Sequence, residues 1–144
     1  MGHRLRETSR AAQPDVLLIA ADWRSRALIL AELQERGLEV TALPGLRLGL
    51  KALIRGRLAP RALLIDVWDD DFASPQTVGD ALALLPQAPV VLVVGTWDRA
   101  RYEDLAGGQV TLLVRPVSVG EIVSAMCERL KGANGSPSTE EDKR

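Results

Sequence analysis

The chain has 144 residues, which is enough for one domain with a substantial core and too short for two. Apolar residues make up 47% and charged residues 26%, and the net charge of -1 argues against a polyelectrolyte partner such as nucleic acid. A single cysteine, Cys127, excludes intrachain disulfides and multi-thiolate metal sites, so we expect a reduced, cytoplasmic setting. We expect no membrane partner, because no segment has the length and apolarity of a membrane span or a secretory signal.

Short apolar runs recur along the chain and predict five strands, at residues 16–20, 38–43, 62–66, 89–94 and 110–114. All but the second are almost continuously apolar, which is typical of parallel strands covered on both faces. The second is more mixed, as expected of an edge strand. The sequence therefore favours a parallel sheet with helices on both sides.

Segments with helical spacing alternate with these strands. Their apolar positions are Ala27, Leu30 and Leu33; Leu46, Leu50, Leu53 and Ile54; Val78, Leu82 and Leu85; and Ile122, Met126 and Leu130. A short fourth helix is predicted within residues 96–108, ended by glycines, and Ser118 with Glu121 forms a capping box at the start of the last helix. The result is an α/β three-layer sandwich over residues 14–131, with flexible arms at 1–13 and 132–144.

In such folds ligands and chemistry gather beyond the carboxyl ends of the strands, where helix amino termini and strand ends converge. Two residues there stand out by type. Asp66 ends the third strand, and Arg115, followed by proline, comes directly after the fifth.

An acid ending the third strand, a basic residue followed by proline after the fifth, and the strand–helix count together resemble the response-regulator receiver domain of two-component signalling. The resemblance covers residues 15–131. It implies a flavodoxin-like (βα)5 fold with sheet order 2-1-3-4-5. It also implies that Asp66 matches the aspartate that accepts a phosphoryl group, and that Arg115 takes the place of a lysine.

Two other features of that family are missing from this chain. In the family, a pair of acids after the first strand binds Mg²⁺ and a Ser or Thr ends the fourth strand, whereas this chain has Ala20, Ala21 and Val94. Alanine methyl groups offer a divalent ion no ligand. We therefore expect Mg²⁺ binding to be lost or weak, and no other cofactor.

Two nearby residues could restore part of that site. Asp22 lies two positions past Ala20, and Thr96 two past Val94, so each would sit on the same face roughly 6–7 Å further out if the strands ran on. The simpler interpretation is that each caps the helix that follows it.

The acids near Asp66 allow two opposite interpretations. Arg115 could pair directly with Asp66 in place of the metal cation, which would make Asp66 a structural anion. The run Asp69–Asp71 is most simply a solvated loop. A weak metal site built from Asp66, Asp70 and Asp22 is the alternative.

Aromatic residues gather near the same edge and on the predicted fourth helix. Trp68 lies beside the candidate pocket, and Trp97, Arg101 and Tyr102 are candidate interface residues, because large aromatics serve as interface anchors. Alternatively, the indoles fill a crevice that no longer takes phosphate.

Basic residues recur every four positions in the second helical segment, at Arg47, Lys51 and Arg55, with no acid from Val40 to Ile65. A solvated helix face is the simpler interpretation, and a docking face for an acidic protein or a phosphate backbone is the alternative.

Three functional hypotheses follow. The first is a degenerate receiver domain that is not an enzyme and acts without phosphorylation, as an interaction module for a sensor kinase, a downstream regulator or a second copy of itself. The second is a single-domain response regulator phosphorylated at Asp66. The third is a flavodoxin-like domain that binds a small ligand in the same crevice.

Overall fold

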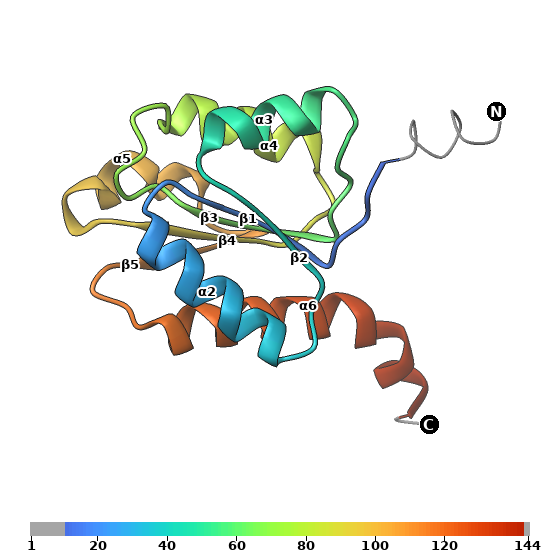
Figure 1. The fold of residues 1–144 in the computed structure, drawn as a ribbon. Helices are drawn as coiled ribbons and strands as arrows, with labels where there is room; N and C mark the ends of the chain where they lie inside the picture. The colour runs from blue at the N-terminus through green and yellow to red at the C-terminus, as the bar shows by residue number, and fades with distance from the viewer. Residues whose placement is uncertain (1–10, 143–144) are drawn as a thin grey trace, which may run out of the picture.

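The computed structural model describes residues 11–142 of the backbone, and side chains to residue 133. Its centre is one parallel sheet of five strands, in the order β2-β1-β3-β4-β5 (Figure 1). The strands are β1 (Val16–Ala20), β2 (Val40–Leu43), β3 (Ala62–Asp66), β4 (Val90–Val94) and β5 (Val110–Val114). The predicted strand positions and the order 2-1-3-4-5 are confirmed.

Helices cover both faces of the sheet (Figure 1). On one face α2 (Trp23–Glu35) packs beside α6 (Val119–Asp142), and on the other α3 (Leu46–Ile54) packs beside α4 (Pro75–Leu84). No helix among residues 11–142 is long and apolar enough to cross a membrane.

The connection between β4 and β5 contains three very short helices in place of the single one predicted for 96–108. These are η1 (Thr96–Asp98), α5 (Arg99–Tyr102) and η2 (Glu103–Leu105). The glycines that were expected to stop the helix do mark the return to β5, since Gly107 and Gly108 have φ of 103° and 58°, which side chains disfavour.

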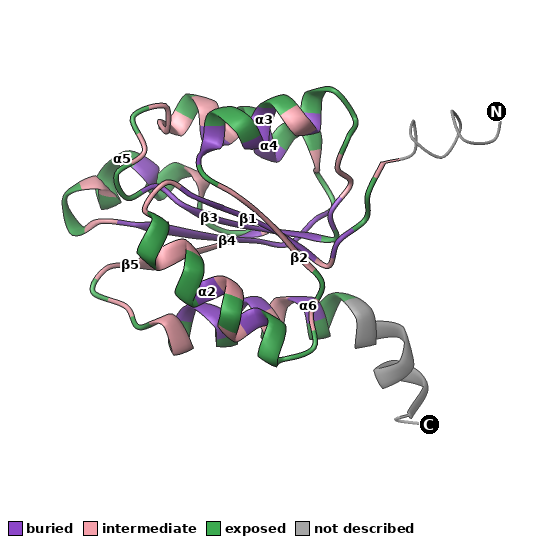
Figure 2. Cartoon of the chain, viewed as in Figure 1, coloured by how far each residue is buried: buried purple, intermediate pink, exposed green. Residues whose placement is uncertain are grey.

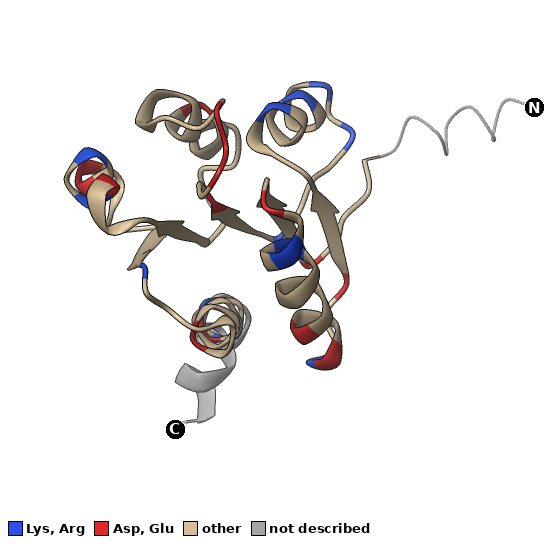
Figure 3. Cartoon of the chain, turned by 60° about the vertical axis from the view of Figure 1, so that its left-hand side comes forward, with Lys and Arg blue, Asp and Glu red and all other residues tan. Residues whose placement is uncertain are grey.

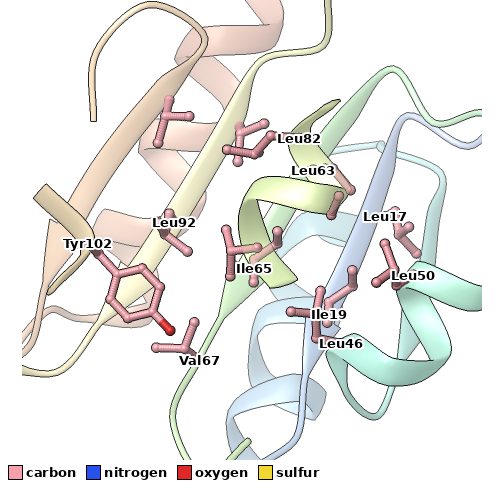
Figure 4. Close-up of a cluster of buried hydrophobic side chains, with 14 of the residues drawn as sticks. Leu17, Ile19, Leu46, Leu50, Leu63, Ile65, Val67, Leu82, Leu92 and Tyr102 are labelled. Atoms are coloured by element: carbon pink, nitrogen blue, oxygen red, sulfur yellow. The ribbon is translucent and has the colours of Figure 1, made fainter. Parts of the chain in front are cut away.

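Alternate strand residues fill two separate cores. Leu17, Ile19, Leu63, Ile65 and Leu92 face α3 and α4 (Figure 4), while residues of the opposite parity face α2 and α6. The three inner strands β1, β3 and β4 are buried at every residue, whereas β2 is half-buried throughout (Figure 2). This explains why the inner strands are continuously apolar and the edge strand β2 is mixed. The other edge strand, β5, is half-buried beyond Val110, although its sequence is almost as apolar as that of the inner strands.

Two of the predicted core positions are wrong. Ala27 is exposed on α2, where Ile29 and Leu33 are the buried residues, four positions apart. Ile54 is 66% exposed at the end of α3, where Leu46, Leu50 and Leu53 hold the buried side. In both helices the apolar pattern is wider than the buried stripe, so spacing alone could not choose the face.

Regular structure continues past the two predicted boundaries of the folded domain, 14 and 131. Ala12 forms a bridge with Leu58, its amide donating to the Arg57 carbonyl at 3.0 Å, and α6 continues to Asp142. A helix that is already nucleated adds one hydrogen bond per residue, so the glycines after Leu130 do not by themselves end it. Residues 1–10 and 143–144 of the predicted arms lie outside the described residues, and the flexibility of the arms stays a prediction.

The predicted capping box at the start of α6 is confirmed. The Glu121 amide donates to Ser118 Oγ at 3.0 Å, and the Ser118 amide donates to Glu121 Oε1 at 2.8 Å. These hydrogen bonds lower the pKa of Glu121. The box fixes where the chain turns from the end of β5 into α6, and so helps to place Arg115 in between.

Candidate functional site

The candidate site lies at the carboxyl end of β3, in the middle of the sheet. The strand register places Asp66 opposite Ala20 of β1 and Val93 of β4. Parallel strands end together at this edge, so residues far apart in the sequence meet here. Figure 3 shows the acidic end of β3 close to the middle of the sheet edge.

Asp66 is 1% exposed and is the buried charged residue of the described core. Its Oδ1 accepts a hydrogen bond from the Trp68 amide at 3.0 Å, and its Oδ2 is ion-paired with Arg115 Nη2. Burial raises the pKa of Asp66, while the Trp68 amide and the Arg115 guanidinium oppose that rise. Both carboxylate oxygens therefore have a donor from the protein itself.

Arg115 reaches Asp66 across β4 from the loop after β5. Its amide donates to the Val94 carbonyl at 2.9 Å, which fixes the backbone position from which the side chain extends. The peptide bond between Arg115 and Pro116 is cis. The guanidinium lies 5.8 Å from the centroid of the Trp68 ring. Its Nε is buried and has no hydrogen-bond partner among the described residues.

A second guanidinium occupies the end of β1, where the resemblance would place two acids. Arg26 Nη1, from α2, donates to the Ala20 carbonyl at 2.8 Å and to the Ala21 carbonyl at 3.3 Å. This edge therefore presents a cation and two methyl groups rather than carboxylates. Sequence reasoning missed Arg26, and nothing in its spacing distinguishes it from the other arginines of the helices.

Asp22 is the N-cap of α2, as the simpler interpretation predicted. Its Oδ2 accepts a hydrogen bond from the Ser25 amide at 2.9 Å, and this bond lowers the pKa of Asp22. The carboxylate thus serves the helix that follows β1.

Thr96 fits neither of its predicted roles. The N-cap of η1 is Gly95, without a side-chain cap, and the Thr96 hydroxyl donates to the Arg115 carbonyl at 2.8 Å. Thr96 therefore ties the loop after β4 to the loop after β5 and fixes the backbone of Arg115. Val94 is fully buried in the core beneath α3 and α4.

Asp70 also caps a helix, and a local pattern could not show it. Its Oδ2 accepts from the Leu46 amide at 2.8 Å at the start of α3, and its Oδ1 accepts from the Phe72 amide at 3.1 Å. The N-cap residue of α3, Gly45, has no side chain to do this, so an acid 24 residues away supplies the acceptor. Asp69 and Asp71 are exposed.

The metal site suggested for Asp66, Asp70 and Asp22 does not form. Each of the three carboxylates is held in a different setting, and no group of three or more His, Cys, Asp or Glu residues within the described chain is arranged to hold a metal ion.

The aromatic residues near the site differ sharply in exposure. Trp97 is 95% exposed and Trp68 is 54% exposed, whereas Tyr102 is 1% exposed and packs in the core (Figure 4). Tyr102 is therefore not an interface residue, and Arg101 beside it is ion-paired with Asp98 at 3.0 Å. Of the three candidate interface residues, Trp97 and Arg101 remain at the surface.

A shallow pocket of about 430 Å³ lies between the indoles, so they do not fill the crevice. Its lining consists of Trp68, Gly95, Thr96, Trp97, Asp98, Arg115 and Pro116. The pocket is open to solvent directly beside the Arg115–Asp66 pair.

No protein-family model and no curated protein sequence matches this chain. Its structure is similar to that of a response regulator receiver protein from Sinorhizobium medicae WSM419, with a TM-score of 0.68 and 18% identity over 86% of this chain and 98% of that one. A CheY-like receiver domain protein from Methanospirillum hungatei JF-1 gives 0.69 and 17%, over 88% and 98%. A structure described as adenylate cyclase from Rhodopirellula baltica gives 0.70 and 19%, over 91% and 96%.

At these identities the similarity concerns the fold. Sheet order and helix placement agree with it. The chain has the flavodoxin-like fold of response-regulator receiver domains.

Proposed function

We propose that this protein is a receiver-type module of two-component signalling that works by binding another protein, without metal-dependent phosphorylation and without enzymatic activity. The observation that carries the proposal is the Arg115–Asp66 ion pair at the end of β3. It puts a fixed protein cation against the carboxylate that would otherwise accept a phosphoryl group.

Phosphoryl transfer to an aspartate depends on electrostatic positioning, in which a divalent ion neutralises the charge that develops on the phosphoryl oxygens. Magnesium needs one or two carboxylates plus water and phosphate oxygens in near-octahedral geometry. Ala20 and Ala21 offer none of these, and the Asp66 oxygens are already bonded to Trp68 and Arg115. A phosphodonor would have to displace the guanidinium without a metal to replace it.

Output from such a module passes through a surface rather than through chemistry. Trp97 stands almost fully exposed next to the pocket beside Arg115, and a rigid indole of this kind is a strong anchor for a protein partner. We propose a sensor kinase, a downstream regulator or a second copy of the chain as that partner, in the cytoplasm.

Exposure of the protein to Mg²⁺ with acetyl phosphate, or with beryllofluoride, tests the proposal. We expect no mass increase by intact-mass spectrometry and no shift of the thermal midpoint. A matched variant, A20D/A21D/R115K, restores the acid pair and the lysine of the family pattern and should gain a Mg²⁺-dependent shift, while the milder A21D/R115K guards against misfolding caused by the buried Ala20 position.

Saturable modification of the wild type that disappears in D66N would refute the proposal. That result would establish the phosphorylated response regulator instead. Transfer from sensor kinases to the wild type, again absent in D66N, would have the same meaning.

A second candidate function is supported by the pocket itself. A volume of about 430 Å³ between two indoles and the Arg115 side chain suits a small planar ligand. A thermal-shift screen of metabolites tests this candidate, since a bound ligand raises the midpoint by mass action. Stabilisation that W68A abolishes would favour ligand binding over protein interaction.

A further inference from the structure

The outward side of α3 carries three cations between two exposed apolar side chains. Arg47, Lys51 and Arg55 are all exposed, and Leu48 and Ile54 are 45% and 66% exposed. At 100° per residue the order around the helix is Ile54, Arg47, Lys51, Arg55, Leu48, over an arc of about 120°. We call Arg47, Lys51 and Arg55 the basic stripe.

The charge of the basic stripe is not balanced within the described chain. None of its three residues forms an ion pair with residues 11–133, and the sequence has no acid from Val40 to Ile65. Figure 3 shows blue without red on this helix. Like charges four residues apart on a helix repel each other, so the basic stripe destabilises the helix unless solvent screens its charges or a partner neutralises them.

One residue of the stripe is held in position. The Arg47 guanidinium lies 4.7 Å from the centroid of the Phe72 ring, in the loop between β3 and α4. A guanidinium supported in this way loses less freedom on binding a carboxylate than a freely rotating one would.

The surroundings of the stripe favour a protein segment over a phosphate backbone or an anionic membrane. A protein segment could bury the exposed apolar surface of Leu48 and Ile54 against its own apolar side chains, which is favourable. A phosphate backbone offers these two residues no apolar partner. Beyond the amino end of α3 lie the exposed Asp69 and Asp71, next to Asp70, which binds the Leu46 amide. These acids would repel an extended anionic surface, whereas a short acidic helix can stop before them.

We propose that this face of α3 is a docking site for an acidic amphipathic helix of a partner protein. Carboxylates at four-residue spacing would face the basic stripe, which extends about 12 Å along the axis, and apolar residues on either side would cover Leu48 and Ile54. The site lies on a different element from the Arg115–Asp66 pair and goes beyond the proposed function. It holds whether or not Asp66 is phosphorylated.

The test uses the full chain and a fluorescently labelled helical peptide with glutamates at every fourth position flanked by leucines. We expect saturable binding by anisotropy, weakened by salt and weakened about a hundredfold in R47E/K51E/R55E. R24E/R36E/K131E is the matched control, because it makes the same change of net charge on α2 and α6 and should bind like the wild type. Circular dichroism checks that each variant is folded. If the charge-reversal variant R47E/K51E/R55E unfolds, the neutral variant R47Q/K51Q/R55Q takes its place.

Three results would overturn the inference. One is no binding of the peptide at concentrations up to about 1 mM. Another is equal loss of binding in the control and stripe variants. The third is tighter binding, through the same three residues, of duplex DNA or of vesicles containing anionic phospholipid, which would assign the stripe to phosphate groups instead.

Discussion

Asp66 shows how much the meaning of one residue depends on its neighbours. A carboxylate at the end of β3 is the residue that the receiver pattern requires, yet here it is buried against a guanidinium and a backbone amide. Removing either partner of a buried pair leaves an uncompensated charge, so such a pair is hard to open for chemistry. The Asp66 carboxylate is therefore held by the Trp68 amide and the Arg115 guanidinium.

The pH dependence of stability reports on this burial. Because burial raises the pKa of Asp66, the folded state keeps a proton that the unfolded state has already lost, and the contribution of this group is full below about pH 4 and falls as pH rises through the raised pKa. In Asp66→Asn this decline is absent. Urea unfolding across this pH range should therefore show the wild type losing stability relative to Asp66→Asn as pH increases, and parallel curves would contradict the assignment.

The aromatic residues give an equally sharp contrast. Tyr102 is 1% exposed, so Tyr102→Ala should lower the free energy of unfolding by about 3 kcal/mol through lost packing. Trp97 is 95% exposed, so Trp97→Ala should change it by no more than about 0.5 kcal/mol. Urea titrations of both variants measure this, and a large loss for Trp97→Ala would mean that the indole is part of the fold rather than a free surface anchor.

At the scale of elements, α3 lies close against β1. A Cβ added to Gly49 would lie 2.5 Å from Ile19 Cδ1 and 3.0 Å from Ile19 Cγ1, inside the fully packed core beneath α3. The helix can approach the sheet this closely only because position 49 lacks a side chain. This packing sets the position of the helix that presents the basic stripe.

Substitution at that contact is predicted to be coupled. Gly49→Ala should destabilise the protein by about 1 kcal/mol, since overpacking outweighs the gain in helix propensity. Removing the clashing methyl in Gly49→Ala/Ile19→Val should make the double variant more stable than the sum of the two single effects, by about 0.5 kcal/mol or more. Chemical denaturation of the wild type, the two single variants and the double variant gives the four free energies of unfolding that the cycle needs. If the effects of the two single substitutions simply add, residues 19 and 49 are not in contact.

The ends of some helices and loops depend on residues that are distant in the sequence. The amino end of α3 takes its acceptor from Asp70 after β3, and the loops after β4 and β5 are joined by Thr96. Such contacts lie 19 and 24 residues apart in the sequence, and local capping rules do not reach so far.

At the scale of the whole molecule, two cores on opposite faces share one sheet and should unfold together. The three tryptophans, Trp23, Trp68 and Trp97, are all more than half exposed and lie outside both cores. We expect a single cooperative transition by far-ultraviolet circular dichroism, with only a small shift of tryptophan emission. A large blue-shifted emission in the native state would show that an indole is buried, for instance in a dimer.

The layers of this protein could be predicted from the amino-acid sequence alone. Strand positions, parallel sheet, helix spacing and the Ser118–Glu121 and Asp22 caps all follow from patterns within a few residues, because burial on two faces and backbone capping are local demands on side-chain type. The exposed Ala27 and Ile54 show the limit of this reasoning, since an apolar stripe does not say which of its residues faces the sheet.

The surroundings of Asp66, in contrast, depend on the tertiary structure. The pair with Arg115 joins residues 49 apart in the chain, so it is not encoded in a short motif, and the Arg26 side chain turns back from α2 over the end of β1. Parallel strands that end at one edge bring such residues together, and the distance and burial reached there determine which charges pair. The sequence could name Arg115 as a candidate partner for Asp66, but the choice between the guanidinium and a metal ion depends on geometry that forms only when the sheet is assembled.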